Sequence, residues 1–245
     1  MPNHENKFPH PSKEKEFERL LNHFSTQVKG LFFQSDHLKT SAQVQLSAAR
    51  QAVFPAVLAL AQLLEGRDHI TYGHSRRIAR ICTEFATYLK WSPELVQLMN
   101  MVGLLHDIGK VIVPDSILMK EGKFTPLEYE TMKLHSGTGG RILQRLEFFG
   151  KEAEDWVIHH HERFDGKGYP DGLKGLQIPV GARIIAIADA YDAMTEVRRY
   201  RQKVPHWIAL DEIIKCGGKQ FDPELANAFA EAFPSAPNPD LTTQV

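Results

Sequence analysis

His106 and Asp107 are adjacent at the end of an apolar stretch, and this pair is the first feature of the sequence that could carry chemistry. A helical period places Val102, Leu105 and His106 on one inward face. A buried imidazole beside a carboxylate is costly unless hydrogen bonds, an opposite charge or a metal compensates it. Lys110 follows at once and brings an ammonium toward the carboxylate. The pair predicts either a hydrogen-bonded core histidine with a helix-capping aspartate, or part of a metal site.

Five further side chains that can bind metal fall on the inner faces of predicted helices. With the first pair, the set is His74, His106, Asp107, His135, His160, His161 and Asp189. Each one alone could be a hydrogen-bonded core histidine or a helix-terminal aspartate. Nitrogen and oxygen donors without thiolates favour iron, manganese or another divalent ion over structural zinc. Seven ligands exceed one tetrahedral site, so the set predicts a binuclear centre with a bridging carboxylate.

The run of three histidines can be divided by helical geometry. On a helix that begins near Lys151, His160 lies close to the centre of the apolar face. His161 is rotated by about 70° to one side, and His159 by about 130° to the other. We therefore predict that His160 and His161 face inward and that His159 faces away or supports the site from behind.

The elements that must position these residues are helices. Ser92-Pro93 begins the helix that ends at His106-Asp107, where Gly109 is expected to stop it. A capping box at Thr125 begins another, which we expect His135 to close. Later helices are expected over 180–195, from about 205 to 216 and from 223, and a glycine-rich bend is expected at 137–140. With no substantial strand pattern, the predicted fold class is all-α, a helical bundle.

Composition narrows the function classes. A net charge of −1 and a pI near 6.9 argue against binding to a nucleic-acid polymer, which needs a basic face. The two cysteines form no disulfide framework or zinc spacing, and Cys82 is expected to be inert packing on an apolar helix face. The N-terminus is polar, and the longest apolar run, 52–64, is too short to cross a bilayer. We therefore predict no membrane span and a cytoplasmic location.

Three regions are expected along the chain. Residues 1–50 are predicted to be a polar tail and a short helical extension, whose apolar stripe suggests a homodimer contact. Residues 51–233 form the predicted catalytic domain, and residues 234–245 a disordered tail.

Several motifs together resemble the HD-GYP family of the HD phosphohydrolase superfamily. They are His106-Asp107-Ile108-Gly109-Lys110, the stretch from His160-His161-Glu162 to Gly168-Tyr169-Pro170, Ala188-Asp189-Ala190-Tyr191-Asp192, Arg198-Arg199-Tyr200-Arg201 and Phe221-Asp222-Pro223. The resemblance covers roughly residues 55–233, with the motifs in order and correctly spaced. It implies a helical bacterial phosphodiesterase that hydrolyses cyclic di-GMP to linear pGpG.

The resemblance also implies roles for particular residues. The seven residues above would be the metal ligands, and Asp107 would bridge two divalent ions, iron or manganese, together with the attacking hydroxide. Lys110 would neutralise a phosphate oxygen, Arg198 and Arg201 would hold the phosphodiester, and Tyr169 would line the substrate groove. Ile70 stands where some relatives carry a glutamate for a third metal. We therefore expect two ions, and this puts the further cleavage to GMP in doubt.

Two other functions compete with this one. The domain could be a non-catalytic cyclic-dinucleotide sensor, or its Gly-Tyr-Pro loop could dock a diguanylate cyclase or another signalling protein. It could also be an HD phosphohydrolase that acts on another nucleotide, although the Gly-Tyr-Pro loop argues against this. The complete ligand set and Lys110 favour the enzyme, because a pure sensor does not need them all.

Overall fold

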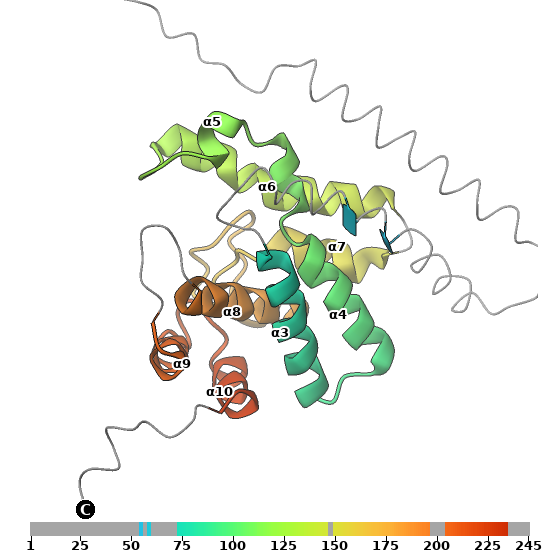
Figure 1. The fold of residues 1–245 in the computed structure, drawn as a ribbon, viewed down its shortest axis with the longest axis vertical. Helices are drawn as coiled ribbons and strands as arrows, with labels where there is room; N and C mark the ends of the chain where they lie inside the picture. Colours follow the sequence, from blue (N-terminus) through green and yellow to red (C-terminus); the bar gives the residue numbers. More distant parts are fainter. Residues whose placement is uncertain (1–53, 56–57, 60–72, 147–148, 197–203, 235–245) are drawn as a thin grey trace, which may run out of the picture.

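The protein is a bundle of helices in the computed structural model, which describes residues 54–55, 58–59, 73–146, 149–196 and 204–234 (Figure 1). The elements are α3 (His74–Tyr88), α4 (Pro93–Leu105), η1 (Ile108–Ile112), α5 (Asp115–Leu118), α6 (Pro126–Arg145), α7 (Gly150–His159), η2 (Gly175–Gln177), α8 (Val180–Thr195), α9 (His206–Lys215) and α10 (Pro223–Ala232). Within these ranges the β-type pairing is one isolated bridge between Gly217 and Phe221. The predicted all-α fold is confirmed. The predicted N-terminal extension, the homodimer contact and nearly all of the C-terminal tail lie outside the described residues.

The helices begin where local capping chemistry predicts. The Ser92 hydroxyl accepts a hydrogen bond from the Leu95 N–H at the start of α4, where Pro93 is the first helical residue. At the start of α6, Thr125 and Glu128 form a reciprocal capping box. The Asp222 carboxylate accepts two backbone N–H bonds at the start of α10. These caps satisfy N–H groups that have no partner within the helix.

The predicted glycine-rich bend after His135 is wrong, because α6 continues through it to Arg145. A Cβ on Gly140 would lie 2.2 Å from Ile158 Cγ1, and one on Gly139 would lie 2.7 Å from Val157 Cγ1. These two glycines therefore allow α7 to approach α6 closely. Tertiary packing outweighs the weak helix propensity of glycine here.

Gly109 also differs from its predicted role as a helix terminator. Helix α4 ends at Leu105, and after the His106-Asp107 turn the chain enters η1, which contains Gly109. A Cβ on Gly109 would lie 1.9 Å from the His135 carbonyl oxygen. The missing side chain allows η1 to lie directly against α6, and this brings the His106-Asp107 turn beside His135.

The core lies among α3, α4, α7 and α8, which pack against one another (Figure 1). Its fully buried side chains include Phe85, Met99, Leu105 and Ile184. Cys82 is also fully buried, and burial raises the pKa of its thiol, which agrees with the prediction of inert packing.

By length and composition, one segment of the described residues could cross a membrane. It is Pro93–Ile112, which has 20 residues and a mean hydropathy of 1.2. Just over half of it, 56%, is buried inside the protein. Packing of α4 into the core accounts for this apolar character.

Candidate metal centre

Asp107 lies at the centre of the candidate site, at the turn between α4 and η1. Its side chain is 16% exposed, and its Oδ2 lies 3.4 Å from His106 Nε2. Lys110, one turn later in η1, donates to the same oxygen at 2.6 Å. Burial opposes ionisation of Asp107, but Lys110 and His106 overcome this and hold the pKa of the carboxyl well below 3.8. The carboxylate is therefore ionised at neutral pH.

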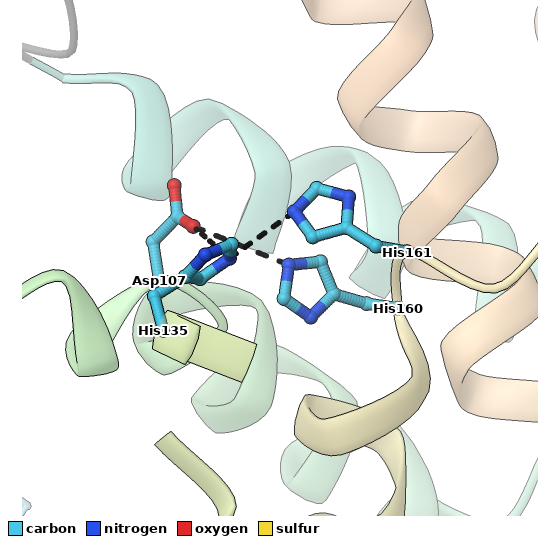
Figure 2. Close-up of side chains that lie close together, drawn as sticks. All are labelled: Asp107, His135, His160 and His161. Carbon is cyan, nitrogen blue, oxygen red and sulfur yellow. Dashed lines mark hydrogen bonds and ion pairs between the residues drawn. The ribbon is translucent and has the colours of Figure 1, made fainter. Parts of the chain in front are cut away.

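The other carboxylate oxygen faces a group of histidines. Figure 2 shows Asp107, His135, His160 and His161 pointing toward one another from the turn before η1, from α6 and from the end of α7. Asp107 Oδ1 lies 3.3 Å from His135 Nε2 and 4.0 Å from His160 Nε2. The Nε2 atoms of His135 and His161 are 3.1 Å apart. One ligand atom from each of the four lies within 4.8 Å of the others, which is close enough to surround one ion.

A second group lies on the other side of Asp107. It consists of His74, His106 and Asp107, again with ligand atoms within 4.8 Å of one another. His74 is the first residue of α3, and its Nε2 lies 3.4 Å from Asp189 Oδ1 on α8. The structure therefore brings all seven predicted ligands together, with Asp107 shared between two groups. This arrangement is suited to two ions and one bridging carboxylate.

Four of the five histidine rings in the cluster are oriented by contacts of their Nδ1 atoms. Three of these donate to the backbone carbonyl three residues earlier, and the fourth contacts a carboxylate. The pairs are His106 with Gly103 at 2.8 Å, His135 with Met132 at 2.6 Å, His160 with Val157 at 2.7 Å and His74 with Asp192 at 2.7 Å. A proton on Nδ1 leaves the Nε2 lone pair directed into the site. Metal-binding histidines commonly use this arrangement.

Two buried nitrogens support a fit to metal. The Nε2 atoms of His106 and His160 are buried and have no hydrogen-bond partner among the described residues. Such atoms are costly in a folded protein unless a bound group, such as an ion, satisfies them. Burial, together with the neighbouring His161, His106 and His135, lowers the pKa of His160 well below 6.5. Burial and His135 lower the pKa of His161 to about 3. Both rings are therefore neutral and able to donate to a metal.

His159 does not join the cluster. Its Nδ1 donates to the Asp155 carbonyl oxygen at 2.8 Å, and its Nε2 lies 3.0 Å from Asp171 Oδ2. Helix α7 ends at His159, and His160 keeps helical backbone angles as its C-cap. The predicted division of the histidine run, with His160 and His161 inward and His159 away, agrees with this geometry.

Tyr169 lies beside the cluster because the loop after α7 folds back on itself. Its backbone N–H donates to the His161 carbonyl oxygen at 3.3 Å, and its ring centroid is 4.9 Å from that of His161. Gly168 is required for this return, since a Cβ there would lie 2.3 Å from the Arg163 backbone nitrogen. Two backbone hydrogen bonds also tie Phe164 and Asp165 to the segment before α10. Two predicted substrate contacts lie outside the described residues, namely Arg198 and Arg201. The same is true of Ile70, the position considered for a third metal.

Asp192 is a part of the site that the sequence patterns did not lead us to predict. This buried carboxylate contacts His74 Nδ1 and accepts from Arg77 Nε at 2.5 Å. Burial opposes its ionisation, yet these two partners lower the pKa of Asp192. The signal that could have found it is its position three residues after Asp189, on neighbouring faces of α8.

Comparisons with known proteins agree with this geometry. Residues 59–225 match the family described as HD domain. A cyclic di-GMP phosphodiesterase of Thermotoga maritima is 35% identical over 227 residues, covering 91% of this chain and 60% of that protein. The 3'3'-cGAMP-specific phosphodiesterase 1 of Vibrio cholerae is 36% identical over 151 residues, covering 62% of this chain and 35% of that protein.

The fold also matches a solved structure. Bd1817, a HDG"Y"P protein of Bdellovibrio bacteriovorus, aligns with a TM-score of 0.56 at 16% identity, covering 88% of this chain and 70% of that one. At this identity the likeness concerns the fold alone. The chain spans about half the length of the curated relatives it matches.

Proposed function

The chain belongs to the HD domain family, within which its motifs are those of HD-GYP proteins, and we propose that it is a metal-dependent phosphodiesterase. Its proposed reaction is hydrolysis of cyclic di-GMP to linear pGpG. Relatives named cyclic di-GMP phosphodiesterases support this substrate class. The observation that carries the proposal is Asp107 between two groups of converging histidine Nε2 atoms, two of which are buried without a hydrogen-bond partner in the part of the chain that the structure describes.

The seven clustered residues would hold two divalent ions. His135, His160 and His161 would bind one ion, His74 and Asp189 would serve the other with His106, and Asp107 would contact both. Divalent ions supply a coordinated water of lowered pKa and charge neutralisation at phosphate oxygens. Nitrogen and oxygen donors without thiolate favour iron or manganese.

The protein's own groups would position the phosphodiester. The Lys110 side chain is 24% exposed although its ammonium contacts Asp107, so it can also meet a phosphate oxygen. There it would stabilise negative charge that develops as the phosphorus–oxygen bond breaks. Tyr169 would border the groove next to His161. Arg198 and Arg201 remain proposed phosphate contacts by their motif positions.

A related cyclic dinucleotide is the second candidate substrate. A relative named a cyclic di-GMP phosphodiesterase and one named 3'3'-cGAMP-specific are 35% and 36% identical to this chain, so overall similarity does not separate the two substrates. A sensor without turnover is a weaker candidate, because it does not require the complete ligand set around Asp107. Docking of a diguanylate cyclase through the Gly-Tyr-Pro loop stays a prediction.

Metal analysis and product identification on one preparation test the proposal. Protein purified without oxygen should contain about two ions of iron or manganese per chain and convert cyclic di-GMP to pGpG. Chelation should abolish turnover, and added Mn²⁺ or Fe²⁺ should restore it. Turnover that survives complete removal of metal, or a loaded protein that cleaves no cyclic dinucleotide, would overturn it.

A further inference from the structure

Helix α6 presents two side chains toward the Gly-Tyr-Pro loop that have no part in the candidate metal cluster. They are Tyr129 and Lys133, four residues apart and therefore on the same face of the helix. Tyr129 is 47% exposed, which is high for an aromatic side chain beside a candidate site. This position calls for an explanation other than core packing.

Successive ring contacts lead from the candidate metal cluster to Tyr129. The His161 and Tyr169 centroids are 4.9 Å apart with planes inclined at 31°, and those of Tyr169 and Tyr129 are 6.3 Å apart at 81°. Lys133 Nζ lies 4.8 Å from the Tyr129 centroid and 5.7 Å from the Tyr169 centroid. Two aromatic rings and one ammonium therefore converge at the edge of the cluster.

The ammonium is held there only weakly by its acidic neighbour. Lys133 Nζ contacts Glu130 Oε1 at 2.7 Å, and the Glu130 side chain is 65% exposed. Ion pairs this close to solvent contribute little free energy, so a ligand with hydrogen-bond acceptors can replace the glutamate. The exposed Tyr129 ring provides a stacking surface, and the ammonium, which lies over both tyrosine rings, provides hydrogen-bond donors beside it.

A guanine base fits these three groups better than adenine does. Both bases can stack on tyrosine rings, since every base has an aromatic face. Guanine presents two acceptors, O6 and N7, along one edge, and lysine commonly binds them. Adenine presents an amino donor in place of O6, which does not pair with an ammonium.

We propose that Tyr129, Lys133 and Tyr169 form a subsite for one guanine base of a cyclic dinucleotide. The exposed Tyr129 ring stacks on one face of the base, the Tyr169 ring, inclined at 81° to it, meets the edge of the base, and the Lys133 ammonium donates to O6 and N7. The inference rests on the proposed function, because a phosphodiester at the metal centre has its base only one sugar away. Lys133 would then decide between guanine and adenine at this position.

Binding of cyclic di-GMP and cyclic di-AMP, measured by calorimetry on the intact protein without turnover, tests the subsite. The wild type should prefer cyclic di-GMP, and Lys133→Met, which retains most of the apolar stem, should weaken that affinity by about 5- to 100-fold. The affinity for cyclic di-AMP should change by less than about threefold, so that the preference falls. Lys151→Met is the matched control, because Lys151 is 69% exposed on α7 and belongs to neither ring contact.

Variants of Tyr129 separate the contribution of ring stacking from that of hydrogen-bond donation by Lys133. Tyr129→Leu should weaken the affinity for both dinucleotides by about 5- to 100-fold. Tyr129→Phe should retain the affinity for both within about threefold, because the ring face remains. Tyr88→Leu is the control, since Tyr88 is similarly exposed, at 42%, on α3. Metal content should remain that of the wild type in every variant, which distinguishes a base subsite from support of the cluster.

The outcomes separate this inference from the proposed function. If the wild type binds with a guanine preference that Lys133→Met removes but hydrolyses neither dinucleotide, the subsite stands and the phosphodiesterase proposal fails. If the wild type hydrolyses cyclic di-GMP while Lys133→Met and Tyr129→Leu leave binding and preference unchanged, the subsite is wrong and the phosphodiesterase proposal stands. A wild type that binds both bases equally, or binds neither, also overturns the subsite.

Discussion

His74 and Asp192, 118 residues apart, are joined by a contact of 2.7 Å between Nδ1 and Oδ2. The same carboxylate accepts from Arg77, one turn along α3 from His74. Both Asp192 and His74 are buried. This pairing anchors α8 to the start of α3 and directs His74 Nε2 toward Asp189 and the candidate metal site.

Asp192→Asn should weaken metal retention without removing a proposed ligand. The amide keeps the shape but loses the charge that holds His74 and Arg77, and loss of such support typically costs about 10- to 100-fold in metal affinity. The metal content that remains after dialysis against increasing concentrations of a chelator measures this loss of affinity. Asp211→Asn, on the exposed side of α9, is the control. Unchanged retention in Asp192→Asn would show that the contact does not orient a ligand.

His160→Ala and His159→Ala should differ although the residues are neighbours. His160 Nε2 points into the cluster, so its loss should reduce both metal content and turnover. His159 contacts Asp155 and Asp171, so His159→Ala should retain most of its metal when ions are in excess. Elemental analysis of both variants decides. Equal metal loss would mean that the ligand assignment is shifted by one residue.

Lys110→Met should lower kcat by about tenfold or more while metal content is unchanged. In the proposed reaction the ammonium would stabilise charge on phosphate, and its removal takes a positive charge away from the cations that Asp107 would bind, so metal binding should not weaken. Single-turnover rates together with metal analysis measure this. Loss of metal along with activity would instead assign Lys110 to maintenance of the site.

Alanine substitutions at two glycines of α6 should change the free energy of unfolding in opposite directions. Gly140→Ala places a Cβ against Ile158 and should lower the free energy of unfolding by about 1–3 kcal/mol. A Cβ on Gly137 would meet no other segment of the described residues within 4 Å, so Gly137→Ala should raise the free energy of unfolding by about 0.5–1 kcal/mol. Urea unfolding of both variants, measured at the same metal content, compares the two effects. Equal effects would contradict the close packing of α6 on α7.

The metal-free protein should lose stability as the pH falls from about 6.5 toward 3. Burial lowers the pKa of His160 and of His161, the latter to about 3, so in this range the unfolded chain binds protons that the folded chain does not. His106 acts in the opposite direction: burial lowers its pKa, but Asp107 overcomes this and raises it. Urea midpoints at pH 7 and pH 5 test the sign, and His161→Gln should flatten the difference. A higher midpoint at pH 5 would contradict it.

Features that depend on residues close together in the chain could be predicted from the sequence. Ser92, Thr125 and Asp222 begin helices through hydrogen bonds to N–H groups two or three residues away, so short motifs predict them. The inward phase of His160 and His161 follows from the helical period over α7. The family was also recognisable, because its motifs combine residue types and spacing that appear in the sequence itself.

Features that depend on contacts between distant segments emerged only from the folded protein. Helix α6 continues through Gly139 and Gly140 because α7 packs against the space that their missing side chains leave. Asp192 joins the site only because α8 lies against α3, and Tyr129 with Lys133 faces Tyr169 only because the loop after α7 returns to α6. Such contacts depend on packing between elements far apart in the chain, which the local sequence pattern does not specify.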